Sequence, residues 1–417
     1  MAQAPGSNNP PPAVPSVART APSIKPSKST IEDNEDTDPN IILPQKIIPP
    51  EAFETLTGAP LLAVGEPPRS TLKMPEMGIL NDLMKDPTVT EIMINDIRNI
   101  IIEKNGKLTP SGLNYASLDD LNRITRNILD TSRRILSPDQ PYVDTMLPDG
   151  SRVNIVGPPL TINGPCITIR RFPSKRLSTK DLLASGAMDQ KIAYFLSICV
   201  IARLNILVSG GTGSGKTTLL NVLTGYIPRE ERIVTIEDTP ELVIQHINSV
   251  RLQTKPSSPT LPAITIRDLV ANSLRMRPDR IIIGEVRKGE AFDMLLAMNT
   301  GHSGSMTSVH ANSPRDALMR VETLCMLAGT DIPILAIRKQ VTSALDLIVQ
   351  IRRFKNGRRR VIAISEVTGM EGETITIQDI FHFDPVDERF KATGFVPTFV
   401  ERLREEGFEL PPHLFGG

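Results

Sequence analysis

The sequence predicts an α/β protein in which a parallel sheet forms the main domain and a smaller α+β domain precedes it. Its 417 residues suit two or three domains, at about 100–200 residues per domain. Strands and helices alternate from about residue 201 to 350, which is typical of a parallel sheet with helices on its faces. A glycine-rich loop directly follows one of these strands, where such sheets bind phosphate.

Residues 1–70 are predicted to be a disordered, proline-rich arm. They hold 14 of the chain's 36 prolines, which remove amide donors and disfavour helix. The arm is either a solvated tail or a docking segment for a partner. No secretory signal pattern opens the chain, and its most apolar run, Tyr194 to Val208, is interrupted by Arg203 and Asn205. We therefore expect the protein inside the cell, with any membrane contact made through a partner.

An α+β domain is expected over residues 74–173, from the periodicity of its apolar residues and from two turn signals. The predicted elements are a helix at Ile79–Met84, strands at Glu91–Asn95 and Asn99–Glu103, a hairpin turn at Asn105-Gly106, a helix at Ser117–Arg134, a second hairpin at Asp149-Gly150, and a strand at Ile167–Arg171.

The main domain is expected over residues 179–417, after a linker at residues 174–178. Two helices between Leu177 and Ile201 precede the alternating segment. An antiparallel meander is expected to follow it, with strands at Leu347–Ile351, Val361–Ser365 and Thr374–Ile377.

Composition narrows the function. The 47 basic and 47 acidic residues balance, and 4 Tyr, 12 Phe and no Trp leave few stacking platforms, so nucleic-acid binding is disfavoured. Cys166, Cys199 and Cys325 are odd in number and scattered. They indicate a reducing compartment and are too few for a four-cysteine zinc site.

The strongest motif matches G-x-x-x-x-G-K-[ST] and follows the apolar strand Asn205–Ser209. Backbone N–H groups of such a loop point at phosphates, and the next helix adds the positive end of its dipole. Lys216 is expected to reach the β- and γ-phosphates, and the Thr217 hydroxyl to bind Mg²⁺. The predicted nucleotide-binding residues are Gly210, Gly211, Thr212, Gly213, Ser214, Gly215, Lys216, Thr217 and Thr218.

Carboxylates follow two further apolar strands. Glu237 and Asp238 come after Ile233–Ile236, and Glu285 comes after Arg280–Gly284. Because ligands lie beyond the carboxyl ends of parallel strands, we expect Glu237 to orient or deprotonate the attacking water and Glu285 to hold Mg²⁺. For the Glu237 segment, an exposed acidic turn that caps the next helix is the alternative.

His302 and His310 lie within nine residues in a stretch rich in Gly, Ser and Thr. A lone histidine is usually a packed or surface residue, but this pair favours contacts to the γ-phosphate or to the acid that positions water. Zinc binding is the alternative role for the two histidines, although no third nitrogen or sulfur ligand is near in the sequence.

These four motifs, in this order, resemble the secretion ATPases of type II secretion, type IV secretion and type IV pili. The resemblance covers about residues 75–417 and implies a RecA-like P-loop ATPase domain behind a smaller α+β, PAS-like domain. Within this superfamily, the chain resembles the Tad/Flp pilus motors of CpaF type. It lacks a tetracysteine insertion, and two of its segments are similar to theirs. Those segments are Leu147–Asn154 and the closing Phe395–Phe415.

The resemblance also implies a homohexamer with ATP and Mg²⁺ held between the two domains. Arginines of the amino-terminal domain would then close onto the phosphates, and the matching positions are Arg152, Arg170 and Arg171. Such arginines neutralise charge on the γ-phosphoryl oxygens. A solvated linker pair is the alternative for Arg170 and Arg171, and Arg275 and Arg277 are candidates for a subunit contact.

The expected function is that of a cytoplasmic ATPase, peripheral at the inner membrane, that powers assembly of a Tad/type IVc pilus through a membrane platform protein. Retraction of the pilus is a further option. One alternative is a type IV secretion or DNA-transfer ATPase, and another is a nucleotide-gated scaffold with little turnover. The basic run at residues 352–360 is expected to be a solvated hairpin or a surface for acidic partner loops, with a nucleic-acid or lipid-headgroup patch as the alternative.

Overall fold

The computed structural model describes residues 73–172, 177–244, 246–257, 261–329 and 331–416. The predicted arm at residues 1–70 lies outside the described residues, as does most of the predicted linker.

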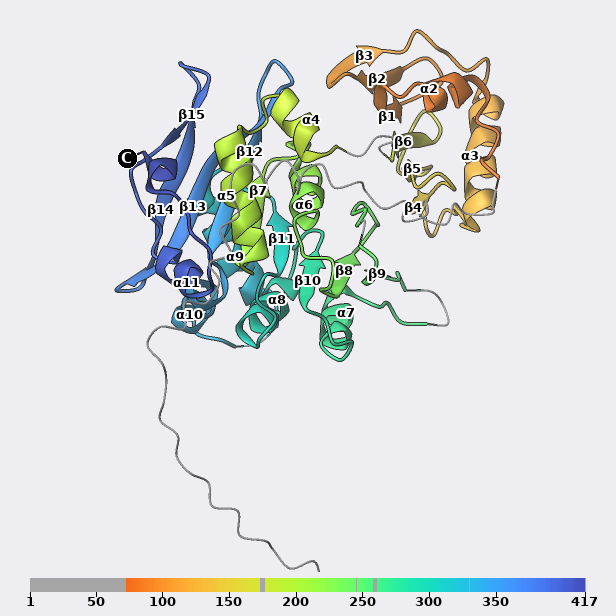
Figure 1. Cartoon of the computed structure of the whole chain (residues 1–417). Helices are drawn as coiled ribbons and strands as arrows, with labels where there is room; N and C mark the ends of the chain where they lie inside the picture. Colours follow the sequence, from red (N-terminus) through yellow and green to blue (C-terminus); the bar gives the residue numbers. More distant parts are fainter. Residues whose placement is uncertain (1–72, 173–176, 245, 258–260, 330, 417) are drawn as a thin grey trace, which may run out of the picture. The chain divides into compact units, whose positions relative to one another are not determined.

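The first described part contains a six-stranded antiparallel sheet in the order β3-β2-β1-β6-β5-β4 (Figure 1). Helix α3 packs its apolar face on this sheet, and together they bury a separate hydrophobic core. Its elements are η1 (Gly78–Leu80), α2 (Asn81–Lys85), β1 (Val89–Ile94), β2 (Ile100–Lys104), β3 (Lys107–Pro110), α3 (Leu118–Ser132), β4 (Tyr142–Met146), β5 (Arg152–Val156) and β6 (Cys166–Arg170).

Local sequence explains several boundaries in this part. Asn105 and Gly106 have φ of 51° and 75°, the left-handed pair that a tight two-residue hairpin needs. Ser117 caps α3 by accepting the Asp120 N–H at 3.2 Å, which satisfies one unpaired donor of the first turn. The two hairpins and the helix predicted here are confirmed.

The second part is built on a nine-stranded mixed sheet in the order β15-β14-β13-β12-β7-β11-β10-β8-β9. Strands β12, β7, β11, β10, β8 and β9 are parallel, and β13 to β15 continue from β12 as an antiparallel meander. Its elements are α4 (Thr179–Ala184), α5 (Gln190–Ile201), β7 (Ile206–Gly210), α6 (Lys216–Thr224), β8 (Ile233–Glu237), β9 (Ser249–Gln253), α7 (Ile266–Ser273), β10 (Arg280–Ile283), α8 (Glu290–Asn299), β11 (Met306–Val309), α9 (Pro314–Met326), α10 (Ile334–Ala344), β12 (Leu347–Arg353), β13 (Arg359–Glu371), β14 (Thr374–Asp384), β15 (Arg389–Ala392), α11 (Val400–Glu405) and η2 (Pro412–Phe415).

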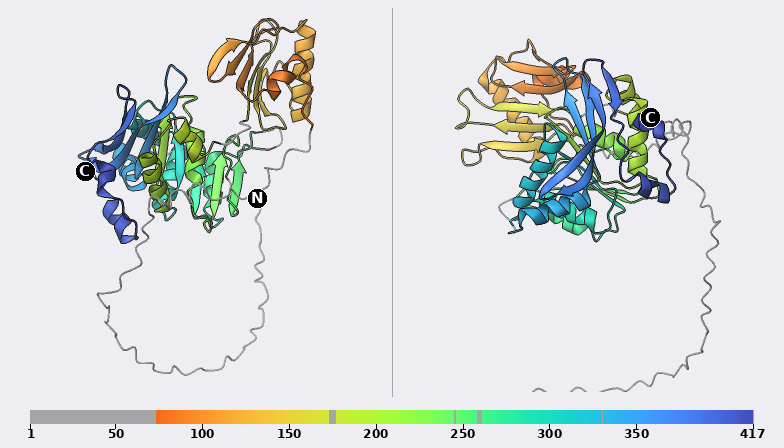
Figure 2. Two further views of the ribbon diagram at one scale, coloured as in Figure 1. Left: turned by 45° about the horizontal axis from the view of Figure 1, so that its top comes forward. Right: turned by 90° about the vertical axis from the view of Figure 1, so that its left-hand side faces the viewer.

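Helices cover both faces of this sheet, as Figure 2 shows. Ile206 and Val208 of β7 face a core shared with α4, α5 and α6. Leu207, between them, faces a second core shared with α7 to α10. Side chains alternate along a strand, so a continuous apolar run such as β7 supplies both cores.

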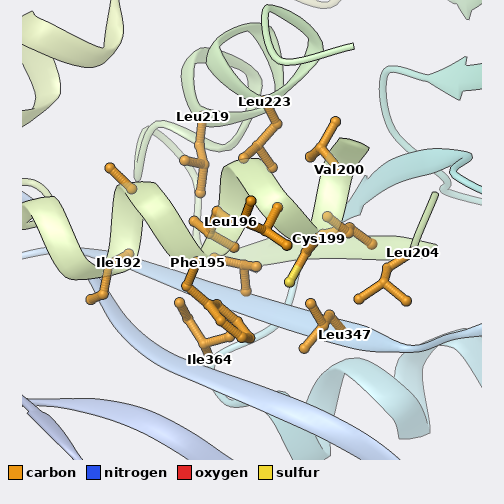
Figure 3. Packing of buried hydrophobic residues seen from close by; sticks show 14 of the residues in the cluster. Ile192, Phe195, Leu196, Cys199, Val200, Leu204, Leu219, Leu223, Leu347 and Ile364 are labelled. Carbon is orange, nitrogen blue, oxygen red and sulfur yellow. The ribbon is translucent and has the colours of Figure 1, made fainter. Parts of the chain in front are cut away.

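The last elements close the first of these cores. Phe195 of α5 is fully buried there, among the residues drawn in Figure 3. Its ring packs edge-on against Phe381 at 5.2 Å and against Phe415 at 6.1 Å. Aromatic edge-to-face pairs of this kind add to the stabilisation from buried area, so η2 is an integral part of the domain.

No helix among the described residues is long and apolar enough to cross a membrane. Cys166, Cys199 and Cys325 are free thiols.

Candidate nucleotide site

The phosphate loop lies between β7 and α6, at the carboxyl edge of the parallel strands. Gly213 and Gly215 have φ of 66° and 101°, which favour glycine. A Cβ on Gly210 would lie 2.5 Å from the carbonyl oxygen of Ile351 on β12. Glycine is required at positions 213 and 215 because their backbone is left-handed, and at position 210 because strand β12 lies close to it.

Lys216 opens α6 and points back over the loop. Its ammonium donates to the Gly211 carbonyl at 3.2 Å and lies 3.3 Å from both ring nitrogens of His310. Burial lowers the pKa of Lys216, and the negative charge of Glu285 opposes that shift. Within the described part of the chain, no carboxylate forms an ion pair with Lys216, so this cation is available to an anionic ligand.

Glu285 follows β10 and is shared by two partners. It accepts from Arg287 at 3.1 and 3.3 Å, and its Oε1 lies 3.0 Å from Nε2 of His310. Burial and the adjacent positive charge of Lys216 lower the pKa of His310. The imidazole of His310 therefore lies between a lysine and a glutamate, in reach of both.

Glu237 ends β8 and is buried, with 4% of its surface exposed. Its Oε1 accepts the N–H groups of Glu241 and Leu242 at 2.8 and 2.9 Å, while Oε2 accepts no hydrogen bond from the described residues. Burial raises the pKa of Glu237 to about 7. Gly284 makes room for it, because a Cβ there would lie 3.0 Å from Cγ of Glu237. Glu237 itself is thus not exposed, whereas the adjacent Asp238 is, and Glu237 does cap backbone donors.

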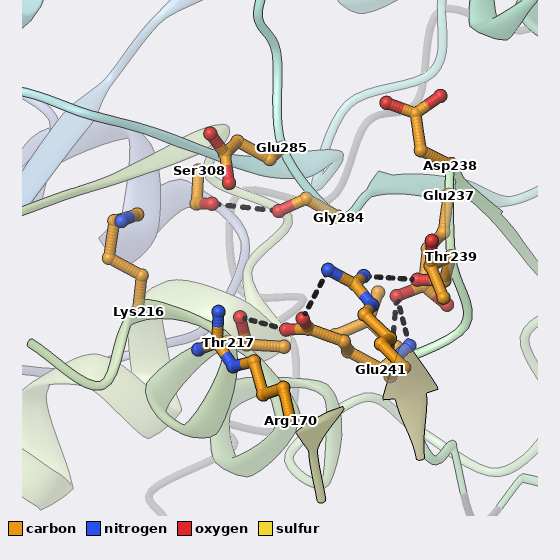
Figure 4. Close-up of polar contacts among 12 residues, drawn as sticks. Arg170, Lys216, Thr217, Glu237, Asp238, Thr239, Glu241, Gly284, Glu285 and Ser308 are labelled. Carbon is orange, nitrogen blue, oxygen red and sulfur yellow. Dashed lines mark hydrogen bonds and ion pairs between the residues drawn. The ribbon is translucent and has the colours of Figure 1, made fainter. Parts of the chain in front are cut away.

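Glu241 is a site residue that the sequence reasoning missed. Its Oε2 accepts the Thr217 hydroxyl at 2.9 Å, and its Oε1 pairs with Arg152 at 3.0 Å. Arg152 also donates to the Thr239 carbonyl at 3.0 Å. Figure 4 shows Glu241 beside Thr217, with Thr239 nearby. Glu241 belongs to the same acidic segment as Glu237, but only the fold shows that it reaches Thr217.

The two consecutive arginines at the end of β6 are oriented differently. Arg170 pairs weakly with Glu91 at 3.6 Å and is half exposed. It lies close enough to Lys216 to lower the pKa of that ammonium, after the larger effect of burial; Figure 4 shows its side chain at the same site. Arg171 instead donates to the Val89 carbonyl at 2.9 Å. Neighbouring residues of a strand face opposite sides, so only Arg170 is brought to the phosphate loop.

His302 is not brought to the phosphate loop. It precedes β11, and its Nδ1 lies 3.3 Å from the Ala297 carbonyl at the end of α8. His310 follows the same strand, at the opposite edge of the sheet. Arg275, two residues beyond α7, donates to the Ala271 carbonyl of that helix. It makes no contact with the loop among the described residues.

The donors at this edge suit Mg²⁺. Thr217, Glu241 and Glu285 present hard oxygen ligands, and Mg²⁺ is typically bound by one or two such groups together with substrate phosphates and water. Among the described residues, no three His, Cys, Asp or Glu side chains are arranged to hold a metal ion by themselves. The protein part of the site is therefore compatible with Mg²⁺ that arrives with a nucleotide.

The loop, its lysine and the adjacent carboxylates define a P-loop nucleotide-binding protein. The profile of the type II/IV secretion system protein family matches residues 74–374, and the chain belongs to that family. A Mycobacterium tuberculosis (strain H37Rv) protein named for conjugal transfer is 34% identical over 314 residues, which are 74% of this chain and 88% of that protein. Conjugal transfer protein TrbB of Rhizobium radiobacter is 33% identical over 315 residues, 73% of this chain and 91% of that protein.

Solved structures show the same fold. The pilus retraction motor PilT with bound ADP has a TM-score of 0.51 and 21% identity, over 72% of this chain and 84% of that chain. The ATPase DotB of Yersinia pseudotuberculosis has a TM-score of 0.51 and 18% identity, over 81% and 90%. The resemblance to the secretion ATPases is confirmed, while the Tad/Flp branch within them stays a prediction.

Proposed function

We propose that this protein is the ATP-hydrolysing motor of a membrane-bound secretion or pilus machine, working as a cytoplasmic homohexamer peripheral to the inner membrane. One observation carries the proposal: Lys216, Thr217, Glu285 and His310 converge at the carboxyl edge of the parallel strands, with Glu237 and Glu241 beside them. These are the groups that phosphoryl transfer to water requires.

The residues divide the work as follows. The phosphate loop and Lys216 bind the β- and γ-phosphates, and Arg152 and Arg170 neutralise charge at the γ-phosphate. Glu237 takes the proton of the attacking water at Oε2, because its backbone contacts use only Oε1. Its pKa of about 7 suits a base at neutral pH.

Thr217 and Glu285 would hold Mg²⁺. When bound, the ion neutralises charge on the phosphates and orients them. Thr217 is hydrogen-bonded to Glu241, and Arg152 is paired with the same carboxylate. Glu241 therefore holds two groups that the proposed reaction needs, and their release from it must accompany nucleotide binding.

Removal of the phosphate-binding cation tests the proposal. We expect Lys216→Ala to lower steady-state ATPase of the purified full chain about tenfold or more, because no other lysine reaches the loop among the described residues. Lys339→Ala, on the exposed face of α10, is the matched control. Phosphate release is measured with both variants and the wild type.

Two results would contradict the motor. Near-normal turnover of Lys216→Ala would show that the site is elsewhere. A wild-type hexamer that binds ATP but releases almost no phosphate would favour the nucleotide-gated scaffold.

For the machine that the motor serves, we propose a Tad/type IVc pilus, on the strength of the segments that resemble CpaF-type motors. Conjugal transfer is the second candidate, since two similar relatives carry that name. Stimulation of the ATPase by proteoliposomes that hold a pilus platform protein supports the first. Stimulation by DNA, without such a protein, supports the second.

A further inference from the structure

The basic run between β12 and β13 does not form a uniform solvated hairpin. Among the described residues, the Arg358 side chain is paired only with the exposed Glu388, at 3.4 Å. Arg360 is buried and lies 4.7 Å from the ring centre of Phe383. Arg353 and Arg359 instead reach the phosphate loop. The arginines of this one hairpin therefore lie in two different environments.

Arg359 contacts the loop directly. Its Nε donates to the Gly213 carbonyl at 2.9 Å. Its Cδ lies 3.3 Å from the position that a Cβ on Gly215 would occupy. Both glycines have left-handed backbones, so Arg359 holds the loop at the residues whose conformation is least favoured in an ordinary chain.

Arg353 anchors the hairpin beside this contact. Its guanidinium donates to Glu103 of β2 at 2.7 Å and to the Gly106 carbonyl in the β2–β3 turn. One of its nitrogens lies 3.2 Å from the position of a Cβ on Gly213. Glu103 is 8% exposed, and its other oxygen accepts the Thr90 hydroxyl at 3.2 Å, so this acidic group is fully engaged.

The charge distribution is unusual for a purely structural contact. Burial lowers the pKa of Arg359, the neighbouring Arg353 lowers it further, and Glu103 is the one carboxylate that opposes the shift. Two guanidinium groups are thus held together at a loop that already contains Lys216. Convergent cations of this kind favour an anion at the site.

We propose that Arg353 and Arg359 form an arginine clasp on the phosphate loop. Arg359 is a positioning residue that holds the Gly213 peptide in the phosphate-binding conformation, and Arg353 fastens the hairpin to Glu103. The proposal rests on the nucleotide-binding function proposed above and adds two residues that lie about 140 positions after the motif itself.

Nucleotide affinity and loop exchange test the role of Arg359. We expect Arg359→Ala to weaken binding of a non-hydrolysable ATP analogue by the full chain about tenfold, since it loses a charged hydrogen-bond donor. Without nucleotide, we expect faster amide hydrogen exchange in peptides that cover residues 210–218. Arg358→Ala, in the same hairpin, should leave both unchanged.

The outcomes separate this proposal from the general function. If Arg359→Ala binds the analogue as the wild type does, or if its loop exchanges at the wild-type rate, the clasp is wrong while the nucleotide site stands. If neither the wild type nor any variant binds the analogue, the function itself is wrong, and the exchange of the empty loop still tests the clasp. Equal weakening in Arg358→Ala would reduce the effect to bulk charge and overturn the proposal.

A charge reversal tests the anchor. We expect Arg353→Glu and Glu103→Arg each to weaken analogue binding, and the double variant to recover most of the affinity because the pair is rebuilt in reverse. Circular dichroism and thermal melting report whether each chain is folded. A folded double variant that binds no better than the single variants would overturn the role of Arg353.

Discussion

The two edges of the parallel strands both contain clustered ionisable side chains, yet these clusters differ in how they are held. At the amino edge, Arg280 has no exposed surface and forms a two-point ion pair with Glu231 at 2.6 and 3.0 Å. At the carboxyl edge, the side chains of Glu285 and His310 are 21% and 40% exposed and lie 3.0 Å apart. The amino edge is saturated by its own contacts, whereas the carboxyl edge keeps its groups accessible.

The difference indicates what distinguishes a binding site from a structural ion pair. In a buried ion pair, each charge compensates the other, and removal of one member leaves an uncompensated charge. Groups that await a ligand are instead held by contacts that the ligand can replace, as Glu241 holds Thr217. Charge and burial alone do not locate the site, since the most buried arginine lies at the other edge.

The largest effect is expected at the amino edge. Arg280→Ala leaves Glu231 buried without its main partner and should lower the free energy of unfolding by about 3–5 kcal/mol. Replacement of both residues, Arg280→Met with Glu231→Leu, should cost much less. Urea unfolding measures both, and a single-variant loss below about 1 kcal/mol would show that the two edges do not differ in this way.

The second effect is a pH dependence at the carboxyl edge. The pKa of Glu237 is about 7 in the folded state against 4.5 ordinarily, so the folded protein holds this proton where the unfolded chain has lost it. The free energy of unfolding should therefore fall as pH rises from 4.5 to 7, by about 3 kcal/mol for this group.

Urea unfolding at pH 5 and pH 8 isolates this contribution. Glu237→Gln should show a smaller fall than the wild type, and Asp238→Asn, its exposed neighbour, should not. An unchanged fall in Glu237→Gln would mean that this carboxyl group is ionised throughout, like an ordinary surface acid.

The third effect concerns activity rather than stability. Glu285→Ala should lower ATPase about tenfold or more, because Glu285 is the residue proposed to hold Mg²⁺ and it contacts His310. Its free energy of unfolding should change by less than about 1 kcal/mol, since the side chain is partly exposed. Phosphate release and urea unfolding are compared with Glu388→Ala, a largely exposed glutamate at 59%. A large loss of stability with normal turnover would reverse the comparison.

The smallest effects separate the two histidines. His310→Ala should lower kcat/KM for ATP about threefold to tenfold, because the imidazole contacts both Lys216 and Glu285. His302→Ala should change it less than about twofold, because that residue lies at the other end of β11. Equal losses of kcat/KM in both variants would contradict this separation, because His302 makes no contact with the phosphate loop among the described residues of the single chain.

Local sequence patterns predicted much of the fold and part of the candidate site. The Asn105-Gly106 turn and the phosphate loop were predictable because their backbone conformations demand particular residues. Edge strand β9 (Ser249–Gln253) was missed because its residues are partly buried or exposed, so it lacks the apolar run that marks β8. The roles of neighbouring Arg170 and Arg171 depended on which face of β6 meets the phosphate loop, and one sequence does not set that.

Long-range partners were the main gap. Glu241 meets Thr217 across 24 residues, and Arg359 meets Gly213 across 146. Such contacts follow from strand order and from the connection of β12 to β7, which are properties of the whole sheet. Residue type identified these side chains as charged, but only their positions in the fold showed which of them face the phosphate loop.

The packing of Phe415 against Phe195 has a consequence for synthesis of the chain. The two rings are 220 positions apart and belong to the core that supports β7 and the phosphate loop. Contacts so distant in sequence form late and slow folding. On the ribosome, the six-stranded amino-terminal sheet can fold as soon as it emerges, whereas the core beneath the nucleotide loop stays incomplete until residues 412–415 have been released.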